Sequence, residues 1–108
     1  HRVKGVNIWP QAVDDLLFSI PEVDEYLVTL TTGPTGADIA TVTVMPKPEA
    51  AIADGFSERL SGRLRERVGV RFEIALAPLG TLQRSEYKAR RWRDERAYKS
   101  KPAAAPPR

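Results

Sequence analysis

The stretch YLVTLTTGPTGADIATVTVM, residues 26–45, decides the fold of this chain. Both of its ends are rich in β-branched residues, and the turn-forming sequence Gly-Pro-Thr-Gly separates them at positions 33–36. Two such runs around a turn of this composition are typical of a β-hairpin. We therefore expect antiparallel strands over Tyr26–Thr32 and Ile39–Met45, with Pro46 closing the second.

Two amphipathic helices are predicted on either side of this hairpin. From Pro10 to Ile20 apolar residues recur at i, i+3, i+4 and i+7, which is the spacing of one helix face. A second apolar stripe of helical period runs through residues 56–68. We expect Asp54 or Ser57 to cap its start and Gly69 to end it.

Two outer strands complete the expected pattern. Val3–Trp9 is short and β-leaning, with Gly5 interrupting it, and Val70–Ala77 alternates apolar and polar residues. The order β-α-β-β-α-β is that of the ferredoxin-like sandwich. We expect an α+β fold in which two helices cover one face of a small antiparallel sheet. The aromatic side chains expected in its core or in domain contacts are Trp9, Phe18, Phe56 and Phe72.

The composition limits the functions open to the chain. Its 108 residues make one domain, and its start at His1, within a strand-like segment, suggests a piece of a longer protein. The absence of cysteine excludes disulfides and thiolate metal sites and fits a reducing compartment, the cytoplasm. His1 is the only histidine, which argues against a histidine metal site or general base. No run approaches the about 20 apolar residues of a membrane span.

Charge is unevenly distributed along the chain. Residues 83–108 carry nine basic and three acidic side chains, whereas residues 1–82 carry eight basic and eleven acidic ones. The basic arm is therefore expected to meet phosphates, nucleic acid, an acidic partner or solvent. Asp14 and Asp15 are expected on a solvated helix face. The Ala/Pro-rich end, 97–108, is predicted to be disordered, which leaves residues 1–96 as the domain.

Residues 80–91, GTLQRSEYKARR, are the candidate functional segment. The segment begins with a turn residue and has almost no apolar side chain that would anchor it in a core. Lys88 within it is a compact cation on a mobile stem, suited to deliver positive charge to an anionic reacting centre. From composition alone, a basic loop that only keeps the protein in solution remains the alternative.

Two segments together resemble the C-terminal domain of adenylate-forming acyl-CoA ligases, in particular the phenylacetate-CoA ligase-like branch. They are KGVNIWP at positions 4–10, with the acidic-aliphatic helix start that follows, and GTLQRSEYKARR at positions 80–91. Two positions depart from the branch, which usually has proline where this chain has Gln83 and glycine where it has Tyr87. The resemblance extends from about His1 to about Arg96.

The resemblance implies a mobile lid on a two-step enzyme. A carboxylic acid and MgATP would form an acyl-adenylate, and the thiol of coenzyme A would then displace AMP. Lys88 is implied as the catalytic lysine of the first step. Most ATP, Mg²⁺, coenzyme A and acid-binding groups would lie on a large N-terminal domain, so the isolated chain is expected to be inactive. The residues implied in substrate or coenzyme A binding are Lys4, Gly5, Val6, Asn7, Arg84, Ser85, Glu86 and Arg90, with Arg91 as a further phosphate or domain contact.

Other functions remain open at this point. A regulatory domain that binds a small ligand or oligomerises would need no lysine at position 88. An RNA-binding module of the same shape needs aromatic residues on central strands to stack bases, and Ile39–Met45 offers none. Within the ligase interpretation, the sequence does not decide the acid, of which aryl acids are suggested by the branch, or whether a carrier-protein thiol replaces coenzyme A.

Overall fold

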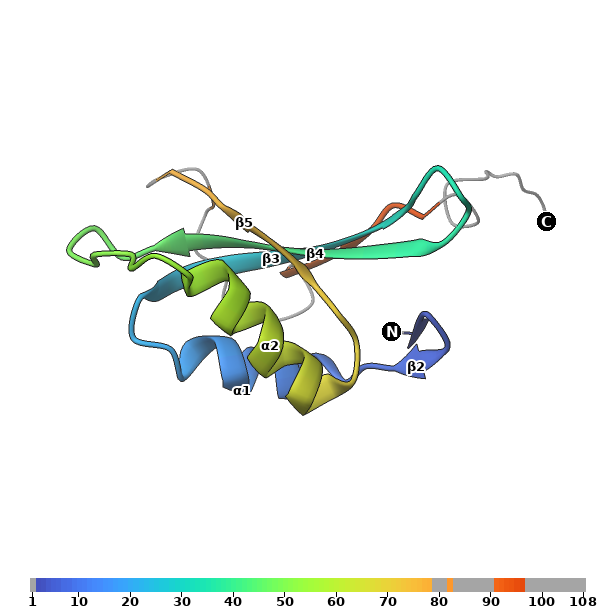
Figure 1. The fold of residues 1–108 in the computed structure, drawn as a ribbon, viewed down its shortest axis with the longest axis horizontal. Coiled ribbons are helices and arrows are strands. Elements are labelled where there is room, and N and C mark those ends of the chain that lie inside the picture. The colour runs from blue at the N-terminus through green and yellow to red at the C-terminus, as the bar shows by residue number, and fades with distance from the viewer. Residues whose placement is uncertain (1, 79–81, 83–90, 97–108) are drawn as a thin grey trace.

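The computed structural model of the protein describes residues 2–78, 82 and 91–96. Its elements follow one another as two short strands, a helix, two long strands, a second helix and two further strands. Figure 1 shows both helices on the same face of the main sheet. The bounds are β1 Arg2–Val3, β2 Val6–Asn7, α1 Pro10–Phe18, β3 Val23–Thr32, β4 Asp38–Pro46, α2 Phe56–Val68, β5 Glu73–Leu76 and β6 Trp92–Asp94.

The hairpin of β3 and β4 forms the centre of a four-stranded sheet of order β5-β4-β3-β6. The two central strands are antiparallel, with Thr29 opposite Thr41. Because the helices lie on one face of this sheet, the α+β class and the ferredoxin-like arrangement expected from the sequence are confirmed.

The sheet is mixed rather than wholly antiparallel, which corrects the sequence prediction. Strand β5 runs parallel to β4, and β6 runs parallel to β3. For β5 the reason is α2, since a helical crossover carries the chain back to the end of the sheet at which β4 began, so that β5 runs in the same direction as β4. Strand β6, with Val28 opposite Trp92, was not predicted, because its three residues lie in a charged segment without alternation.

The expected first strand, Val3–Trp9, is also wrong in detail. Strands β1 and β2 pair only with each other in a separate two-stranded sheet. The φ angles of Lys4 and Gly5 are 52° and 78°. Two consecutive positive φ angles characterise the tight two-residue turn that reverses a hairpin. The segment therefore folds back on itself instead of extending into the main sheet.

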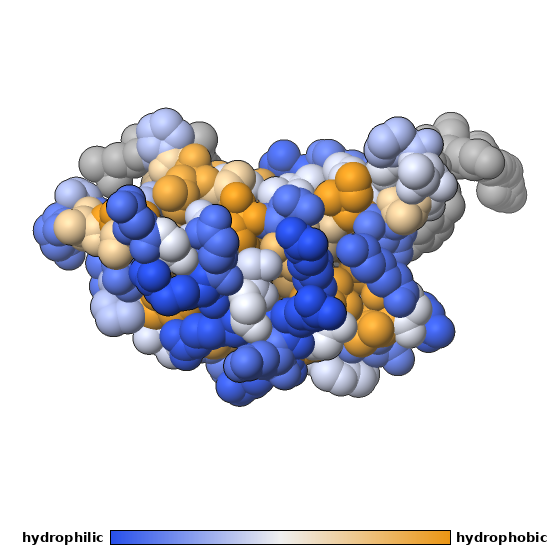
Figure 2. All heavy atoms as spheres, in the orientation of Figure 1, coloured by the Kyte–Doolittle hydropathy of each residue, from blue (hydrophilic) through white to orange (hydrophobic). Residues whose placement is uncertain are grey.

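The core lies between the helices and the β3–β4 pair. Pro10 opens α1, where its missing N–H costs no helical hydrogen bond. The apolar stripe of α2 faces the sheet. Its outward side is therefore covered by hydrophilic side chains, as Figure 2 shows. Burying each large apolar side chain contributes roughly 1.5–3 kcal/mol. The buried residues that join helices to sheet include Val13, Leu16, Leu17, Leu60, Leu64, Val28, Leu30, Val42 and Val44.

The ends of α2 were predicted with mixed success. Gly69 ends the helix in the left-handed region, with φ 81°, and its N–H donates to the Arg65 carbonyl oxygen at 2.8 Å. The expected capping by Asp54 or Ser57 is wrong, because Gly55 is the N-cap and no side chain caps it. The amide N–H groups of the first turn are thus not bonded by a capping side chain.

The four aromatic residues assigned to core or domain contacts divide into two pairs. Phe56 and Phe72 are buried in the core, whereas 71% of Trp9 and 41% of Phe18 are exposed. Placement in the core is therefore wrong for Trp9 and Phe18, and a domain contact remains a prediction for both. Neither described helix is long and apolar enough to cross a membrane.

Candidate functional site

The structure describes only part of the predicted site. Lys4, Gly5, Val6 and Asn7 are placed on the β1–β2 hairpin. The predicted catalytic residue Lys88 lies outside the described residues. So do the other predicted residues of that segment, which are Arg84, Ser85, Glu86 and Arg90. Description resumes at Arg91, three positions after the lysine.

The hairpin turn is held by a carboxylate from the main sheet. The backbone N–H of Lys4 donates to Oδ2 of Asp38, at the start of β4, over 2.9 Å. A lysine with positive φ is uncommon, so this bond stabilises a backbone conformation that the residue rarely adopts. A Cβ at Gly5 would meet nothing within 4 Å, so the glycine is required by its backbone angle and not by crowding within the domain.

The hairpin has an anchoring side and a displayed side. Val3 and Ile8 are buried in the core, and half-buried Val6 packs against it. Lys4, Gly5 and Asn7 are exposed. Of the four predicted binding residues on the hairpin, Val6 is thus an anchor. The ammonium group, the side-chain amide and the turn backbone are the groups open to a ligand.

The same substitution is expected to have opposite effects at two glycines. Gly5→Ala should destabilise the domain by about 1 kcal/mol, because alanine disfavours positive φ. Gly62→Ala, inside α2 where a Cβ would also meet nothing, should stabilise it by up to about 1 kcal/mol. Urea unfolding of both variants measures this difference, and Gly5→Asn should be milder than alanine. A Gly5→Ala variant as stable as the wild type would contradict the assigned turn.

Arg91 lies in the first of two ion-paired clusters that the sequence did not predict. Its Nε donates to Oε1 of Glu25 over 2.7 Å, and its Nη2 to Oε2 over 3.4 Å. Its Nη1 donates to Oδ1 of Asp14 over 3.3 Å. Only 12% of the Arg91 side chain and 4% of the Glu25 side chain are exposed. A forked contact of this kind fixes the guanidinium group in orientation as well as position.

Two aromatic rings complete this cluster. The guanidinium carbon of Arg91 lies 4.8 Å from the centroid of the Phe18 ring and 5.7 Å from that of Tyr26. The Tyr26 hydroxyl donates to Oδ1 of Asp14 over 3.0 Å. Burial, and next the charge of Asp14, raise the pKa of Tyr26. The hydrogen bond to Glu25 raises the pKa of Arg91 despite burial, so the arginine stays charged.

An irregularity in β3 directs Glu25 into this cluster. The pairing register with β4 shifts between Val23 and Glu25, so that Glu25 and Tyr26 are both buried. Such bulges re-aim side chains. Asp14 was expected on a solvated helix face, and this is wrong, since it bonds both Arg91 and Tyr26. Arg91, expected to contact phosphates or another domain, bonds carboxylates of its own domain instead.

The second cluster surrounds Arg96, whose side chain is 4% exposed. Its Nε and Nη2 bind the two oxygens of Asp94 over 2.9 and 2.7 Å. Its Nη1 donates to the Arg2 carbonyl oxygen and, over 3.2 Å, to Oδ2 of Asp38. The Asp38 oxygen that receives Arg96 also accepts the Lys4 N–H. Arg96 is thereby linked to the hairpin turn through Asp38.

We expect the domain to lose stability at high pH because of Tyr26. Its pKa is raised on folding, so the stability it contributes is complete below about pH 10 and is lost as pH rises above it. The unfolded chain then releases a proton that the folded chain retains. The free energy of unfolding should therefore fall more steeply with pH in the wild type than in Tyr26→Phe, by up to about 1.4 kcal/mol per pH unit. Urea titrations across this range test it, and equal slopes would refute the assignment.

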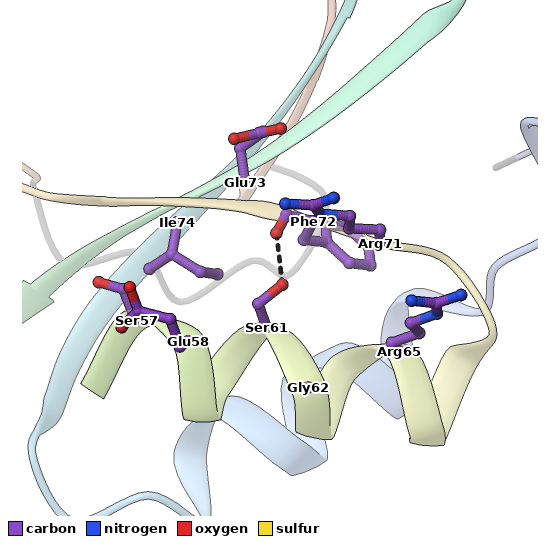
Figure 3. A pocket seen from close by; sticks show the side chains of 9 residues that line it. All are labelled: Ser57, Glu58, Ser61, Gly62, Arg65, Arg71, Phe72, Glu73 and Ile74. Atoms are coloured by element: carbon purple, nitrogen blue, oxygen red, sulfur yellow. Dashed lines mark hydrogen bonds between the residues drawn. The ribbon is translucent and has the colours of Figure 1, made fainter. Parts of the chain in front are cut away.

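An open groove lies between α2 and β5, with a volume of about 390 Å³. Figure 3 shows Arg65 and Arg71 toward one end of it and Glu58 toward the other. The Ser61 hydroxyl donates to the Phe72 carbonyl oxygen over 2.8 Å, which ties the helix to the chain leading into β5. None of the described residues predicted to bind substrate lines this groove.

Comparison with known proteins finds a family and solved structures that share this fold. The family described as the AMP-binding enzyme C-terminal domain matches residues 5–96. The chain belongs to this family. It is a C-terminal domain of an adenylate-forming CoA ligase. Its structure resembles a crystallised domain of phenylacetate-coenzyme A ligase from Bacteroides vulgatus, with 28% identity and a TM-score of 0.77. That match covers 89% of this chain and 92% of the other.

The C-terminal domain is also similar to part of a larger enzyme. It matches 2-hydroxyisobutyryl-CoA ligase, solved with 2-HIB-AMP and CoA in the thioesterification state, with 27% identity and a TM-score of 0.76. This match covers 88% of the chain but 21% of the ligase. A second structure of that ligase, in the postadenylation state with 2-HIB-AMP, gives 26% identity and a TM-score of 0.71. Among curated protein sequences, none matches the chain.

Proposed function

We propose that this C-terminal domain supplies the adenylation lysine, Lys88, to an AMP-forming carboxylate-CoA ligase. In the first half-reaction a carboxylate oxygen attacks the α-phosphorus of ATP, forming an acyl-adenylate and releasing pyrophosphate. In the second, the sulfur of coenzyme A attacks the acyl carbon and AMP departs. The observation that carries the proposal is the family match over residues 5–96, a range that includes the Arg84-Ser85-Glu86 sequence and Lys88.

Lys88 has the chemistry that the first half-reaction needs. Negative charge accumulates on the phosphate oxygens as the carboxylate approaches, and a positioned ammonium group stabilises that charge. A four-carbon stem lets this cation reach from a small domain into a site formed by a larger one. Arg84, Ser85, Glu86 and Arg90 are proposed to accompany it at the substrate.

The β1–β2 hairpin is proposed to serve the second half-reaction. The domain would reorient as a lid, withdrawing Lys88 and bringing the Lys4–Asn7 segment toward coenzyme A. The exposed turn supports this assignment, because Gly5 adds no side chain there and Lys4 offers a cation to phosphate groups. The similarity to a ligase solved in postadenylation and thioesterification states supports two orientations.

A large N-terminal domain of the same polypeptide is the proposed partner. That domain would supply most of the groups that bind ATP, coenzyme A and the carboxylic acid. We suggest aryl acids as the substrates and the cytoplasm as the location of the enzyme. Within residues 2–78, 82 and 91–96, no group of three His, Cys, Asp or Glu side chains could hold a metal ion. We propose that the large domain binds Mg²⁺, and we assign the ion no ligand in this chain.

The test compares the full-length polypeptide with the isolated chain. With a panel of aliphatic and aryl carboxylic acids, the full-length polypeptide should catalyse acid-dependent ATP–pyrophosphate exchange and form thioesters with coenzyme A. Residues 1–108 alone should do neither. Exchange by the isolated chain, or none by the full-length polypeptide with any acid, would overturn the proposal.

The same assays separate the alternative functions. A regulatory or oligomerising domain would leave both half-reactions insensitive to the residue at position 88. Transfer of the acyl group to a carrier-protein thiol would give exchange without a coenzyme A thioester. For an RNA-binding module, no aromatic side chain is available on the strand face away from the helices, within the part of the chain that the structure describes. Salt-sensitive retention of single-stranded RNA would be needed to revive that function.

A further inference from the structure

We propose that the free edge of β5 and the adjoining face of α2 form an interface through which two copies of this chain associate about a two-fold axis. The occupant of the groove between these two elements would be the same surface of a second copy. The inference goes beyond the proposed function and uses none of its steps. It rests on an unpaired sheet edge and on a distribution of charge that is complementary to itself.

Strand β5 lies at one edge of the main sheet, whose order is β5-β4-β3-β6. The N–H of Ala77, directly after β5, donates to the Val44 carbonyl oxygen of β4 over 2.8 Å. Backbone groups of successive strand residues point to opposite edges, so those of Phe72 and Ile74 point away from β4. Within the part of the chain that the structure describes, no strand pairs with this outer edge. An edge of this kind can accept a further strand.

The face of α2 toward the groove carries opposite charges at its two ends. Glu58 and Arg65 are seven residues apart, about two helical turns, so both project from the same side of the helix. Ser61 and Gly62 lie midway between them, and all four residues line the groove (Figure 3). Among the described residues, neither Glu58 nor Arg65 has an ion-pair partner.

The chain that enters β5 also carries opposite charges about a central residue. Arg71 and Glu73 flank Phe72, and both are exposed. Because Phe72 points into the core, its two neighbours lie on the sheet face away from the helices, where Figure 3 shows Glu73. In residues 2–78, 82 and 91–96, neither Arg71 nor Glu73 has an ion-pair partner.

The centres of these two charge patterns lie against each other. The Ser61 hydroxyl donates to the Phe72 carbonyl oxygen over 2.8 Å, which joins the middle of the helix face to the middle of the strand segment. Both arginines therefore lie toward one end of the groove and both glutamates toward the other. A two-fold axis through this centre would set the basic end of one copy against the acidic end of the second. This is the self-complementarity that a symmetric dimer requires.

Gly62 gives the centre of the helix face a low surface. A Cβ at this position would meet nothing within 4 Å, so packing within the chain does not require glycine. Glycine inside a helix also lowers its stability. A low surface between two long charged side chains would instead let a second helix approach. The open groove, with its volume of about 390 Å³, leaves room for side chains of the second copy.

In the proposed dimer the two β5 strands pair antiparallel, so the main sheet continues through both copies with the helices of both on one face. Arg71 of each copy would lie opposite Glu73 of the other, at facing positions whose side chains interact directly. On the helix side, Glu58 of each copy would meet Arg65 of the other. An unrelated extended peptide could pair with the edge as well, but it would leave the balanced charges of α2 unexplained.

The experiment follows the sedimentation of the full-length polypeptide by analytical ultracentrifugation, from about 1 to 100 μM. The wild type should show a monomer–dimer equilibrium whose Kd rises with salt concentration. Glu58→Arg and Arg65→Glu each place like charges opposite one another twice, so each should raise Kd by about tenfold or more. The double exchange Glu58→Arg/Arg65→Glu restores opposite charges and should return Kd close to its wild-type value.

Arg63→Glu is the matched control. It makes the same change in charge as Arg65→Glu at an exposed position of α2 that does not line the groove, so Kd should not change. A second readout needs no substitution. The N–H groups of Phe72 and Ile74 should exchange with deuterium more slowly as protein concentration rises, whereas the Ala75 N–H, which points toward β4, should show no such dependence.

Three results would overturn the inference. The first is a polypeptide that stays monomeric over the whole concentration range. The second is a dimer whose Kd is unchanged by either single reversal, since it would form through another surface. The third is weakening by both single reversals without recovery in the double exchange, because the charges would then not meet across the interface. None of these measurements uses ATP, a carboxylic acid or coenzyme A, so a failure here leaves the proposed function standing.

Discussion

Replacing Lys88 with alanine in the full-length polypeptide is expected to lower the rate of adenylation by about 10²–10³, or roughly 3–4 kcal/mol of transition-state stabilisation. The loss should appear in kcat for acid-dependent ATP–pyrophosphate exchange. Its cause is the removal of one cation from the phosphate oxygens as their charge increases. The KM for the acid should change little, because the acid-binding groups are proposed to lie on the large domain.

The second half-reaction is the internal control for this variant. Thioester formation from pre-made acyl-adenylate should keep its rate, since the lysine is proposed to have left the site by then. Lys47→Ala removes the same charge from an exposed position after β4 and should change neither step. If Lys88→Ala keeps wild-type rates in both steps, the protein is a binding or structural domain and not a catalytic lid.

The central hairpin and the two helices could be predicted from sequence because their signals are local. The alternation before and after residues 33–36 and the helical stripes of α1 and α2 each lie within about a dozen neighbouring residues. Gly69 was likewise predictable, since a glycine after an amphipathic helix is the usual way to end it. The expected roles of Lys88 in adenylation and of the Lys4–Asn7 hairpin in coenzyme A binding came from the family resemblance. The hydrophobic periodicity of the sequence does not indicate either role.

The outer parts of the fold could not be predicted because they depend on contacts between distant residues. Arg91 and Glu25 are 66 positions apart, and Arg96 and Asp38 are 58 apart. Strand β6 gains its conformation from pairing with β3, not from its own residues. Lys4 would not be expected at positive φ from its residue type. A signal did exist in the charges, because the acidic body and the basic arm are complementary, but it did not identify the pairs.

The largest expected loss of stability comes from Phe72→Ala. Phe72 is 1% exposed and lies where the chain passes from α2 into the edge strand β5. Truncating a buried phenylalanine typically costs about 3–5 kcal/mol, because the cavity left behind closes only in part. The matched control is Leu76→Ala on β5, where the side chain is 46% exposed and the loss should stay near about 0.5 kcal/mol.

Urea and thermal unfolding of the two variants provide the measurement. Each kcal/mol lost should lower Tm by about 4–8 °C in a domain of this size, so the phenylalanine variant should melt far below its control. In the full-length polypeptide Phe72→Ala should weaken both half-reactions together at elevated temperature, whereas Lys88→Ala affects adenylation alone at any temperature. Similar unfolding midpoints for Phe72→Ala and Leu76→Ala would mean that Phe72 is not part of the core, and the packing of α2 against β5 would have to be reassigned.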